Sequence, residues 1–98
     1  MIQTIQLYRL DADASRDRAA RALLEELASV PGPLTFEVGL PADAAAAKSW
    51  DISLVLTFED AVAAERTLSG ETYRGAVSRA LGGSVVVEKG WSFSALVR

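Results

Sequence analysis

Residues 52–58 constrain the fold of this chain more than any other segment does. Their large apolar side chains recur at every second position, which places on one face Ile52, Leu54, Leu56 and Phe58. A period of two is typical of a β-strand with one buried face. The alternate residues are small and only semi-polar, and they are Ser53, Val55 and Thr57. The segment therefore predicts a strand that lies under helices on one side and meets another sheet on the other.

The remaining patterns predict three more strands and two helices, the second of them broken. Alternation or β-forming residues mark strands at 2–10, at 34–40 and within 84–98, and helical spacing marks helices at 16–28, 61–68 and 71–81. Ser15 and Asp60 are candidate N-caps, and Pro31-Gly32-Pro33 stops the first helix. Ser69-Gly70 interrupts the second helix. Residues 41–49 are expected to form a loop. Its Ala44 to Ala47 run could form a helical turn, but four alanines bury little surface, so we expect the segment to be mobile.

The order strand, helix, strand, strand, broken helix, strand defines the expected fold class. This βαββαβ order predicts an α+β, ferredoxin-like sandwich, with helices on one face of a four-stranded antiparallel sheet. A chain of 98 residues is expected to form a single domain, residues 1–98. At the C-terminal end, Val85 to Val87 either begin the last strand or pair with it around Lys89-Gly90.

The sheet face away from the helices is expected to be an interface. It carries Val55 and Thr57, with Leu7 or Tyr8 depending on register, and is too apolar to remain in water. The large rings of Trp91 and Phe93 on an edge strand also fit a dimer contact.

Composition excludes several classes of function. The 10 basic and 13 acidic residues give a formal charge of −3, and the basic residues are scattered, so no nucleic-acid surface is expected. The chain has no cysteine and no histidine, which excludes disulfides, thiol nucleophiles, Ser-His-Asp catalysis and histidine-bound haem or zinc. No apolar run approaches the ~20 residues that cross a bilayer, and MIQTIQLYRL lacks the features of a signal peptide. We expect a cytoplasmic protein that does not bind membranes.

A metal site or another cofactor is not expected either. The acidic residues form no Asp-x-Asp-x-Asp-Gly loop, and Asp11 with Asp13 is better explained by turn formation. The glycines form no phosphate-binding loop, because Gly82-Gly83 follows a helix and does not open one.

Several segments together resemble a known family. They are the strand MIQTIQLYRL, a helix ending at a Pro-Gly break, FEVG, the strand SWDISLVLTFED and a broken second helix. Over nearly the whole chain this combination is similar to the stress-responsive A/B barrel domain family, also called Dabb. The resemblance implies a homodimer in which two four-stranded sheets form a shared β-barrel with the helices outside.

The chain departs from this family at the positions that carry chemistry. Family members often have a histidine in the first strand and a His-Pro-x-His motif where the second helix breaks. Here Thr4 stands at the first position, and the break reads Ser69-Gly70-Glu71-Thr72, with Tyr73 next. The family's best understood enzymes are polyketide cyclases that use such histidines as acid and base in an intramolecular aldol condensation. Their mechanism therefore does not transfer to this chain residue by residue.

The candidate site residues come from the first strand and the second helix. Tyr8 and Tyr73 are the candidate catalytic residues, because a tyrosine hydroxyl can polarise a carbonyl or stabilise an enolate. Thr4, Gln6, Thr72 and Val77 are the candidate substrate-binding residues. Tyr73 also lies on the apolar stripe of its helix, so a core position with the hydroxyl at the edge is the simpler explanation for it, and the same holds for Tyr8.

Four further polar residues are weaker candidates, and each has a structural explanation. They are Arg66, Arg74, Asp51 and Glu71. Glu71, for example, lies in the first turn of a helix, where the helix dipole favours a carboxylate in any case.

Three functions fit these observations. The first is a dimer that binds a small, largely apolar organic molecule between sheet and helices. The second is a cyclase-like lyase or isomerase acting on a polyketide-like carbonyl compound without histidine. The third is a structural or partner-binding dimer without pocket chemistry. The space between the strand carrying Thr4, Gln6 and Tyr8 and the helix carrying Tyr73 and Val77 separates the first two from the third.

Overall fold

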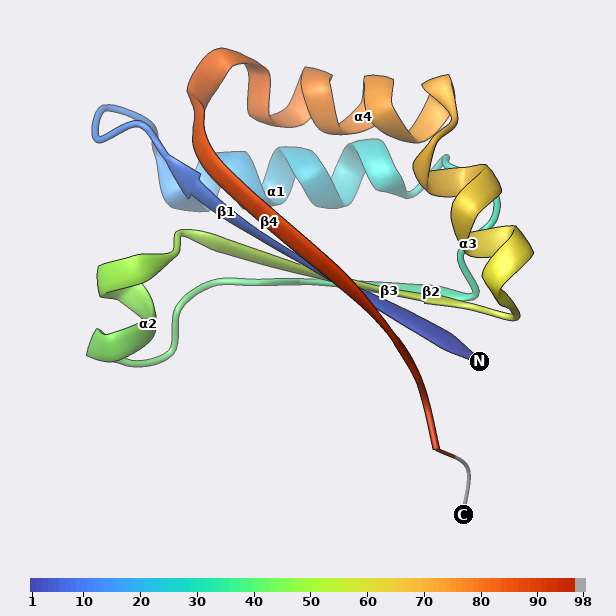
Figure 1. Ribbon diagram of the computed structural model, residues 1–98. Helices are drawn as coiled ribbons and strands as arrows, with labels where there is room; N and C mark the ends of the chain where they lie inside the picture. Colours follow the sequence, from blue (N-terminus) through green and yellow to red (C-terminus); the bar gives the residue numbers. More distant parts are fainter. Residues whose placement is uncertain (97–98) are drawn as a thin grey trace.

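The computed structural model describes residues 1–96 of the chain and contains four strands, four α-helices and one short 3₁₀ helix within that range (Figure 1). In chain order these elements are β1 (Ile2–Leu10), α1 (Arg16–Leu27), β2 (Thr35–Gly39), α2 (Ala44–Ser49), β3 (Ile52–Phe58), α3 (Ala61–Leu68), α4 (Glu71–Leu81), η1 (Gly82–Ser84) and β4 (Val85–Ser94). Ser15 and Asp60 cap α1 and α3 as predicted: the Ser15 hydroxyl accepts from the Arg18 N–H, and the Asp60 carboxylate from the Ala63 N–H.

The strands form one antiparallel sheet in the order β2-β3-β1-β4. Helices α1 and α4 lie side by side over one face of this sheet, and α3 continues that layer at one end (Figure 1). The predicted α+β, ferredoxin-like fold is therefore confirmed. The break between α3 and α4 falls at Ser69 and Gly70, as predicted.

The hydrophobic core lies between the sheet and this helix layer. All four large apolar residues of β3 are buried there, and their face also carries Thr4, Tyr8 and Leu10 from β1. Leu23 and Leu27 of α1 and Ala76 of α4 close the core from above. The alternation of residues 52–58 thus assigns the two faces of the sheet correctly.

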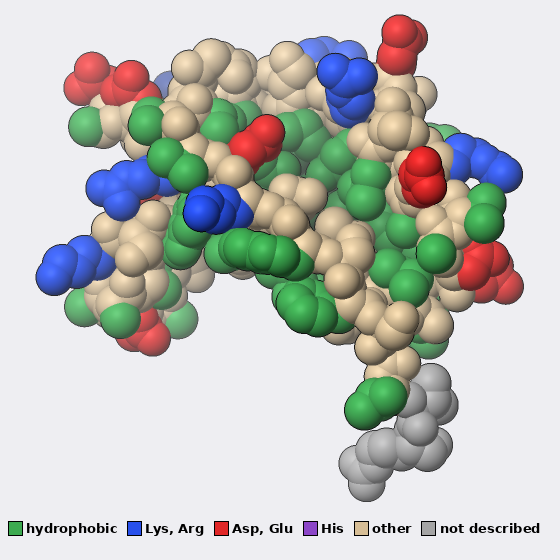
Figure 2. Space-filling view, viewed as in Figure 1, with side chains coloured by type: hydrophobic (Ala, Val, Ile, Leu, Met, Phe, Trp, Pro, Cys, Tyr) green, Lys and Arg blue, Asp and Glu red, His purple; other side chains and the backbone are tan. Residues whose placement is uncertain are grey.

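The opposite face of the sheet is open. On this face Ile5 of β1 lies between Val55 of β3 and Trp91 of β4, its partners in the register. Leu7 of β1 follows on the same face. The edge strand β4 adds Phe93, and the Trp91 and Phe93 side chains are 48% and 54% exposed. Figure 2 shows hydrophobic side chains gathered along the lower side of β4, away from the helices. Leu7, and not Tyr8, is the β1 residue on this face.

Two element assignments differ from the expectation. Residues 44–49 form helix α2 instead of a mobile loop, because both helix ends are capped: the Asp43 carboxylate accepts from the Ala46 N–H, and Arg9 donates to the carbonyl oxygens of Lys48 and Ser49. β2 is shorter than 34–40, since Leu34 and Leu40 lie outside the strand and are exposed.

The structure decides between the two alternatives for the C-terminal segment: Val85 to Val87 begin the last strand. β4 is continuous from Val85 to Ser94 and pairs along its length with β1. No hairpin forms around Lys89-Gly90. The register of this pairing shifts between Arg9 and Leu10, near the end of β1, as at a β-bulge.

Candidate functional site

A hollow of about 400 Å³ lies between α4 and the strands β1 and β4, and we call it the central hollow. Its size is in the range of small-molecule sites. Its wall mixes apolar residues with a few polar ones: Gln6, Tyr8, Leu68, Tyr73, Arg74, Val77, Ser78, Leu81, Gly82, Val85 and Glu88. Figure 2 looks toward the recess between α4 and β4, with hydrophobic side chains in its depth.

The central hollow brings together the two predicted catalytic tyrosines. Tyr8 reaches it from the helix-facing side of β1, and Tyr73 from the first turns of α4, directly after the Gly70 N-cap. Both side chains are buried, at 2% and 7% exposure. The break between α3 and α4 thus sets where Tyr73 enters the hollow.

Burial determines the state of both hydroxyls. It raises the pKa of Tyr8 far above its ordinary value, and interactions with the Tyr73 hydroxyl and the Glu88 carboxylate raise it further. Burial also raises the pKa of Tyr73, as does Glu88, while the interaction with the Tyr8 hydroxyl opposes this rise. Both hydroxyls therefore stay protonated at neutral pH. Because a hydroxyl has one O–H and the two hydroxyls interact with each other, one O–H of the pair remains to donate to a ligand oxygen.

The predicted binding residues divide into two groups. Gln6 and Val77 line the central hollow together with the tyrosines. Thr4 does not line it, because Thr4 is fully buried and its hydroxyl is 2.8 Å from the Ser92 hydroxyl across the β1–β4 pair. Thr72 lies instead in a separate, smaller hollow of about 260 Å³ beside the Pro31-Gly32 turn, where it shares a wall with Tyr73.

Glu88 is a charged residue of the site that the sequence did not indicate. It lies opposite Tyr8 in the β1–β4 register and is the acidic side chain that raises the pKa of both tyrosines. A single acid on an exposed edge strand carries no local signal, since its neighbours come from elements far away in the sequence. Of the weaker candidates, Arg74 lines the central hollow, whereas Arg66 lines the smaller one.

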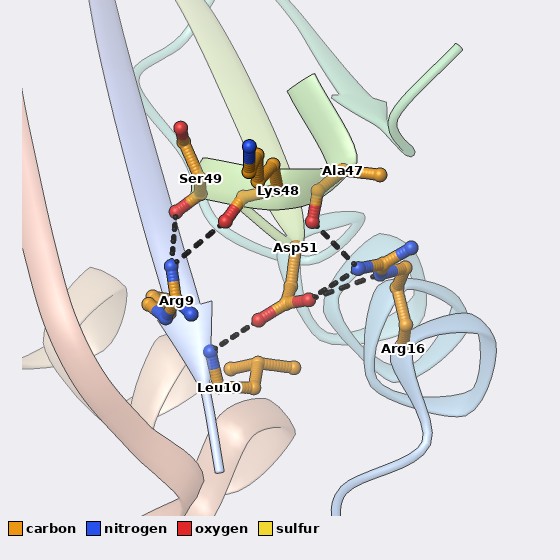
Figure 3. A network of polar contacts seen from close by, with 7 residues as sticks. All are labelled: Arg9, Leu10, Arg16, Ala47, Lys48, Ser49 and Asp51. Atoms are coloured by element: carbon orange, nitrogen blue, oxygen red, sulfur yellow. Dashed lines mark hydrogen bonds and ion pairs between the residues drawn. The ribbon is translucent and has the colours of Figure 1, made fainter. Parts of the chain in front are cut away.

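A third hollow of about 550 Å³, the end hollow, lies where β1 meets α2 and the start of α1. Asp51 organises its polar wall (Figure 3). One carboxylate oxygen accepts from the Leu10 N–H at 2.6 Å, and the other accepts from Arg16 Nε and Nη2 at 3.0 and 2.6 Å.

These contacts hold the Asp51 side chain in its charged form. Burial alone would raise its pKa, but the Leu10 N–H bond and the Arg16 guanidinium, with a further contribution from Arg9, outweigh burial and hold the pKa of Asp51 below its ordinary value. Arg16 and Arg9 also donate to carbonyl oxygens at the C-terminal end of α2 (Figure 3). The network therefore joins β1, α1 and α2, and its groups are occupied with one another.

The structure offers no arrangement suited to a metal ion within residues 1–96, where no group of three or more acidic residues converges. None of the helices in that range is long and apolar enough to span a bilayer.

No protein-family model and no curated protein matches this sequence. Solved structures do match. A Dabb family protein with a ferredoxin-like fold from Mesorhizobium loti is 15% identical, with 98% of this chain and 97% of that chain covered and a TM-score of 0.72. A dimeric ferredoxin-like protein of unknown function from Thermobifida fusca is 18% identical over 96% of this chain and 90% of that one, with a TM-score of 0.75. A protein from Arabidopsis thaliana is 11% identical over 100% and 98% of the two chains, with a TM-score of 0.78.

Identities this low establish the fold and nothing finer. The resemblance seen in the sequence is confirmed for the fold: the chain has the ferredoxin-like fold of these proteins, and a Dabb family protein is among them.

Proposed function

We propose that this protein binds a small, largely apolar organic molecule in the central hollow, and that it does so as a homodimer. The observation that carries the binding proposal is the hollow itself: about 400 Å³ between α4 and the sheet, with two buried tyrosine hydroxyls in its wall. Apolar walls with a few polar groups are typical of small-molecule sites. The protonated hydroxyls of Tyr8 and Tyr73 favour a ligand with a hydroxyl or carbonyl oxygen.

A variant that fills the hollow tests this proposal. Val77→Trp places a large ring in the wall, and we expect it to abolish binding of β-naphthol, measured by calorimetry and by shifts in the amide NMR spectrum. Val62 on α3 is 64% exposed and lies outside the hollow, so Val62→Trp is the matched control and should bind as the natural chain does. Equal binding in the Val77→Trp variant would remove the central hollow from consideration.

A cyclase-like activity is the second candidate, and one observation favours it. Glu88 lines the central hollow with both tyrosines and lies opposite Tyr8 in the β1–β4 register, which gives the hollow a carboxylate base and a hydroxyl donor. In an enolisation, the carboxylate would take a proton from the carbon next to a ketone. The C–H electron pair would form the enolate double bond, and the tyrosines would stabilise the charge on the oxygen.

Deuterium exchange tests this chemistry directly. We expect the protein to accelerate exchange at the CH₂ next to the carbonyl of β-tetralone in D₂O, followed by NMR, and Glu88→Gln to lose that acceleration. If the natural chain leaves deuterium exchange of β-tetralone at its rate in buffer, the cyclase-like activity is rejected, while the proposal of ligand binding still stands. A chain that neither binds nor exchanges supports a structural or partner-binding dimer.

The open face of the sheet supports the dimer. It presents Ile5, Leu7, Val55, Trp91 and Phe93 together, and the match from Thermobifida fusca is a dimeric protein. Packing two such faces together would bury these side chains, as in sheet-on-sheet packing.

Sedimentation equilibrium tests the dimer. At micromolar concentration we expect the mass of two chains, and we expect Phe93→Glu to shift the protein toward a monomer of 10.4 kDa. A natural chain that sediments as a monomer contradicts the proposal. A cytoplasmic location stays a prediction of the sequence, which cell fractionation would test.

A further inference from the structure

Gly90 of β4 faces Gln6 of β1 across the β1–β4 pair, on the side of the sheet that the helices cover. The Gln6 amide lies directly over the Gly90 backbone. A Cβ atom at position 90 would overlap the amide carbon, oxygen and nitrogen of Gln6. Gly90 therefore leaves the space in which the Gln6 side chain lies.

A side chain at position 90 would displace the Gln6 amide from this space. Along the strands its neighbours on the same face are the Tyr8–Glu88 pair on one side and the Thr4–Ser92 pair on the other. The Thr4 and Ser92 hydroxyls are bonded to each other, and Tyr8 is buried. The open space next to Gln6 is the central hollow, whose wall it already forms.

The Gln6 amide has hydrogen-bonding capacity to offer a ligand. Within the part of the chain that the structure describes, no hydrogen bond engages this amide. An amide carries two N–H donors and an acceptor oxygen. Together with the Tyr8 and Tyr73 hydroxyls it gives the hollow a polar side, while Val77 and Leu81 are apolar parts of the same wall.

We propose that Gln6 selects ligands with a hydroxyl or carbonyl group at one end of an apolar body, and that Gly90 is the positioning residue that keeps the Gln6 amide beside the hollow and out of it. The inference rests on the proposed function, because it assigns roles within the same hollow. It predicts two separable effects: Gly90 controls the space, and Gln6 controls the choice between polar and apolar ligands.

Two probes and three variants separate these effects. β-Naphthol and naphthalene have the same ring system and differ by one hydroxyl group, and their dissociation constants are measured by titration in the amide NMR spectrum. We expect Gln6→Ala to weaken β-naphthol about three- to tenfold, as for one lost hydrogen bond, and to leave naphthalene within about twofold.

Gly90→Ala should weaken both probes, by about tenfold or more, because the displaced amide occupies the hollow. The double variant, Gln6→Ala with Gly90→Ala, should bind naphthalene as the natural chain does and β-naphthol as Gln6→Ala does. This rescue separates a positioning role of Gly90 from a merely structural one, since general damage to β4 would not be repaired by removing a second side chain.

Gly39 supplies the matched control. It is a strand glycine whose added Cβ would also meet a side-chain oxygen across the pair, that of Ser53, but on the open face of the sheet. Gly39→Ala should therefore leave both dissociation constants unchanged.

The outcomes distinguish the two proposals. If the natural chain binds neither probe, the binding function fails and the inference fails with it. If the natural chain binds but Gly90→Ala binds equally well, or the double variant is not rescued, the role of Gly90 is overturned while the binding function stands. Unchanged selectivity in Gln6→Ala overturns the role of Gln6.

Discussion

Removing the Asp51 carboxylate should destabilise the protein through one specific group, the N–H of Leu10. In the structure this N–H donates to Asp51 at 2.6 Å, at the point where the β1–β4 register shifts. In Asp51→Ala the N–H loses its acceptor, which typically costs about 1–3 kcal/mol. The Arg16 ion pair adds about 0–1 kcal/mol, because its guanidinium side chain is 39% exposed and its charge is screened by water.

Together these two contributions predict that Asp51→Ala lowers the free energy of unfolding by about 2 kcal/mol. This value lies in the lower half of their summed range, because water in the end hollow can partly replace the carboxylate. Urea unfolding followed by circular dichroism measures this difference. In a domain of this size, it corresponds to a fall in Tm of roughly 8–16 °C. Asp17→Asn is the matched control: Asp17 also pairs with an arginine, Arg21, but both side chains are largely exposed, and we expect a change below about 0.5 kcal/mol.

The pH dependence gives an independent check through Asp51→Asn, which keeps the shape of the side chain but not its charge. The pKa of Asp51 is lower in the folded state than its ordinary value of 3.8. Its charge therefore contributes stability that is complete above pH 3.8 and is lost as the pH falls through the folded-state pKa. The stability gap between the natural chain and Asp51→Asn should close in that acid range. A gap that stays constant with pH, or Asp51→Ala as stable as Asp17→Asn, would refute the reasoning.

The other predictions concern tyrosines and glycines. The chain has only two tyrosines, Tyr8 and Tyr73, so phenolate absorbance reports on the central hollow alone. Neither tyrosine should ionise near pH 10 in the folded protein, whereas both should titrate there in the urea-unfolded chain. The free energy of unfolding should therefore fall above pH 10, where the unfolded state alone loses these protons. Titration of the folded chain near pH 10 would show the hydroxyls to be exposed. Tyr73→Phe should keep the Tm within a few degrees yet weaken β-naphthol about three- to tenfold in calorimetry, and unchanged affinity would remove Tyr73 from the site. Gly32→Ala should lower the free energy of unfolding, measured in urea, by about 2 kcal/mol or more, because Gly32 has a φ of 120° and an added Cβ would overlap the Thr67 side chain. Gly83 has open space around it, so Gly83→Ala should leave this free energy unchanged or raise it slightly.

Local patterns in the sequence were sufficient for most of the fold. Apolar side chains recur at every second position in residues 52–58, and this pattern depends only on which face of the strand is buried. It therefore predicted correctly which face of β3 meets the helices and which does not. Helix α2 could not be predicted in the same way. Its alanines favour helix but bury little, and it is held by Arg9 and Arg16, which come from elements that approach it only after folding.

The candidate site was predictable where it follows from strand and helix faces. Gln6 and Tyr8 share a face of β1 because they are two residues apart, and Tyr73 and Val77 share a face of α4 because they are four apart. Glu88 and Gly90 reach the site through the register between β4 and β1. That register joins Glu88 to Tyr8 and Gly90 to Gln6, eighty or more positions apart, so neighbouring residues in the sequence carry no information about it.

The position of β4 in the sheet has a consequence for handling the protein. Within residues 1–96 this strand pairs with β1 on one side and is an edge of the sheet on the other, and it carries the exposed Val86, Val87, Trp91 and Phe93. An apolar edge strand is a template for aggregation, and the two adjacent charged residues Glu88 and Lys89 interrupt it only briefly. Dilution that separates the proposed dimer should therefore expose the Trp91 and Phe93 rings beside this edge, so that turbidity on storage would increase at low concentration and fall as the dimer re-forms.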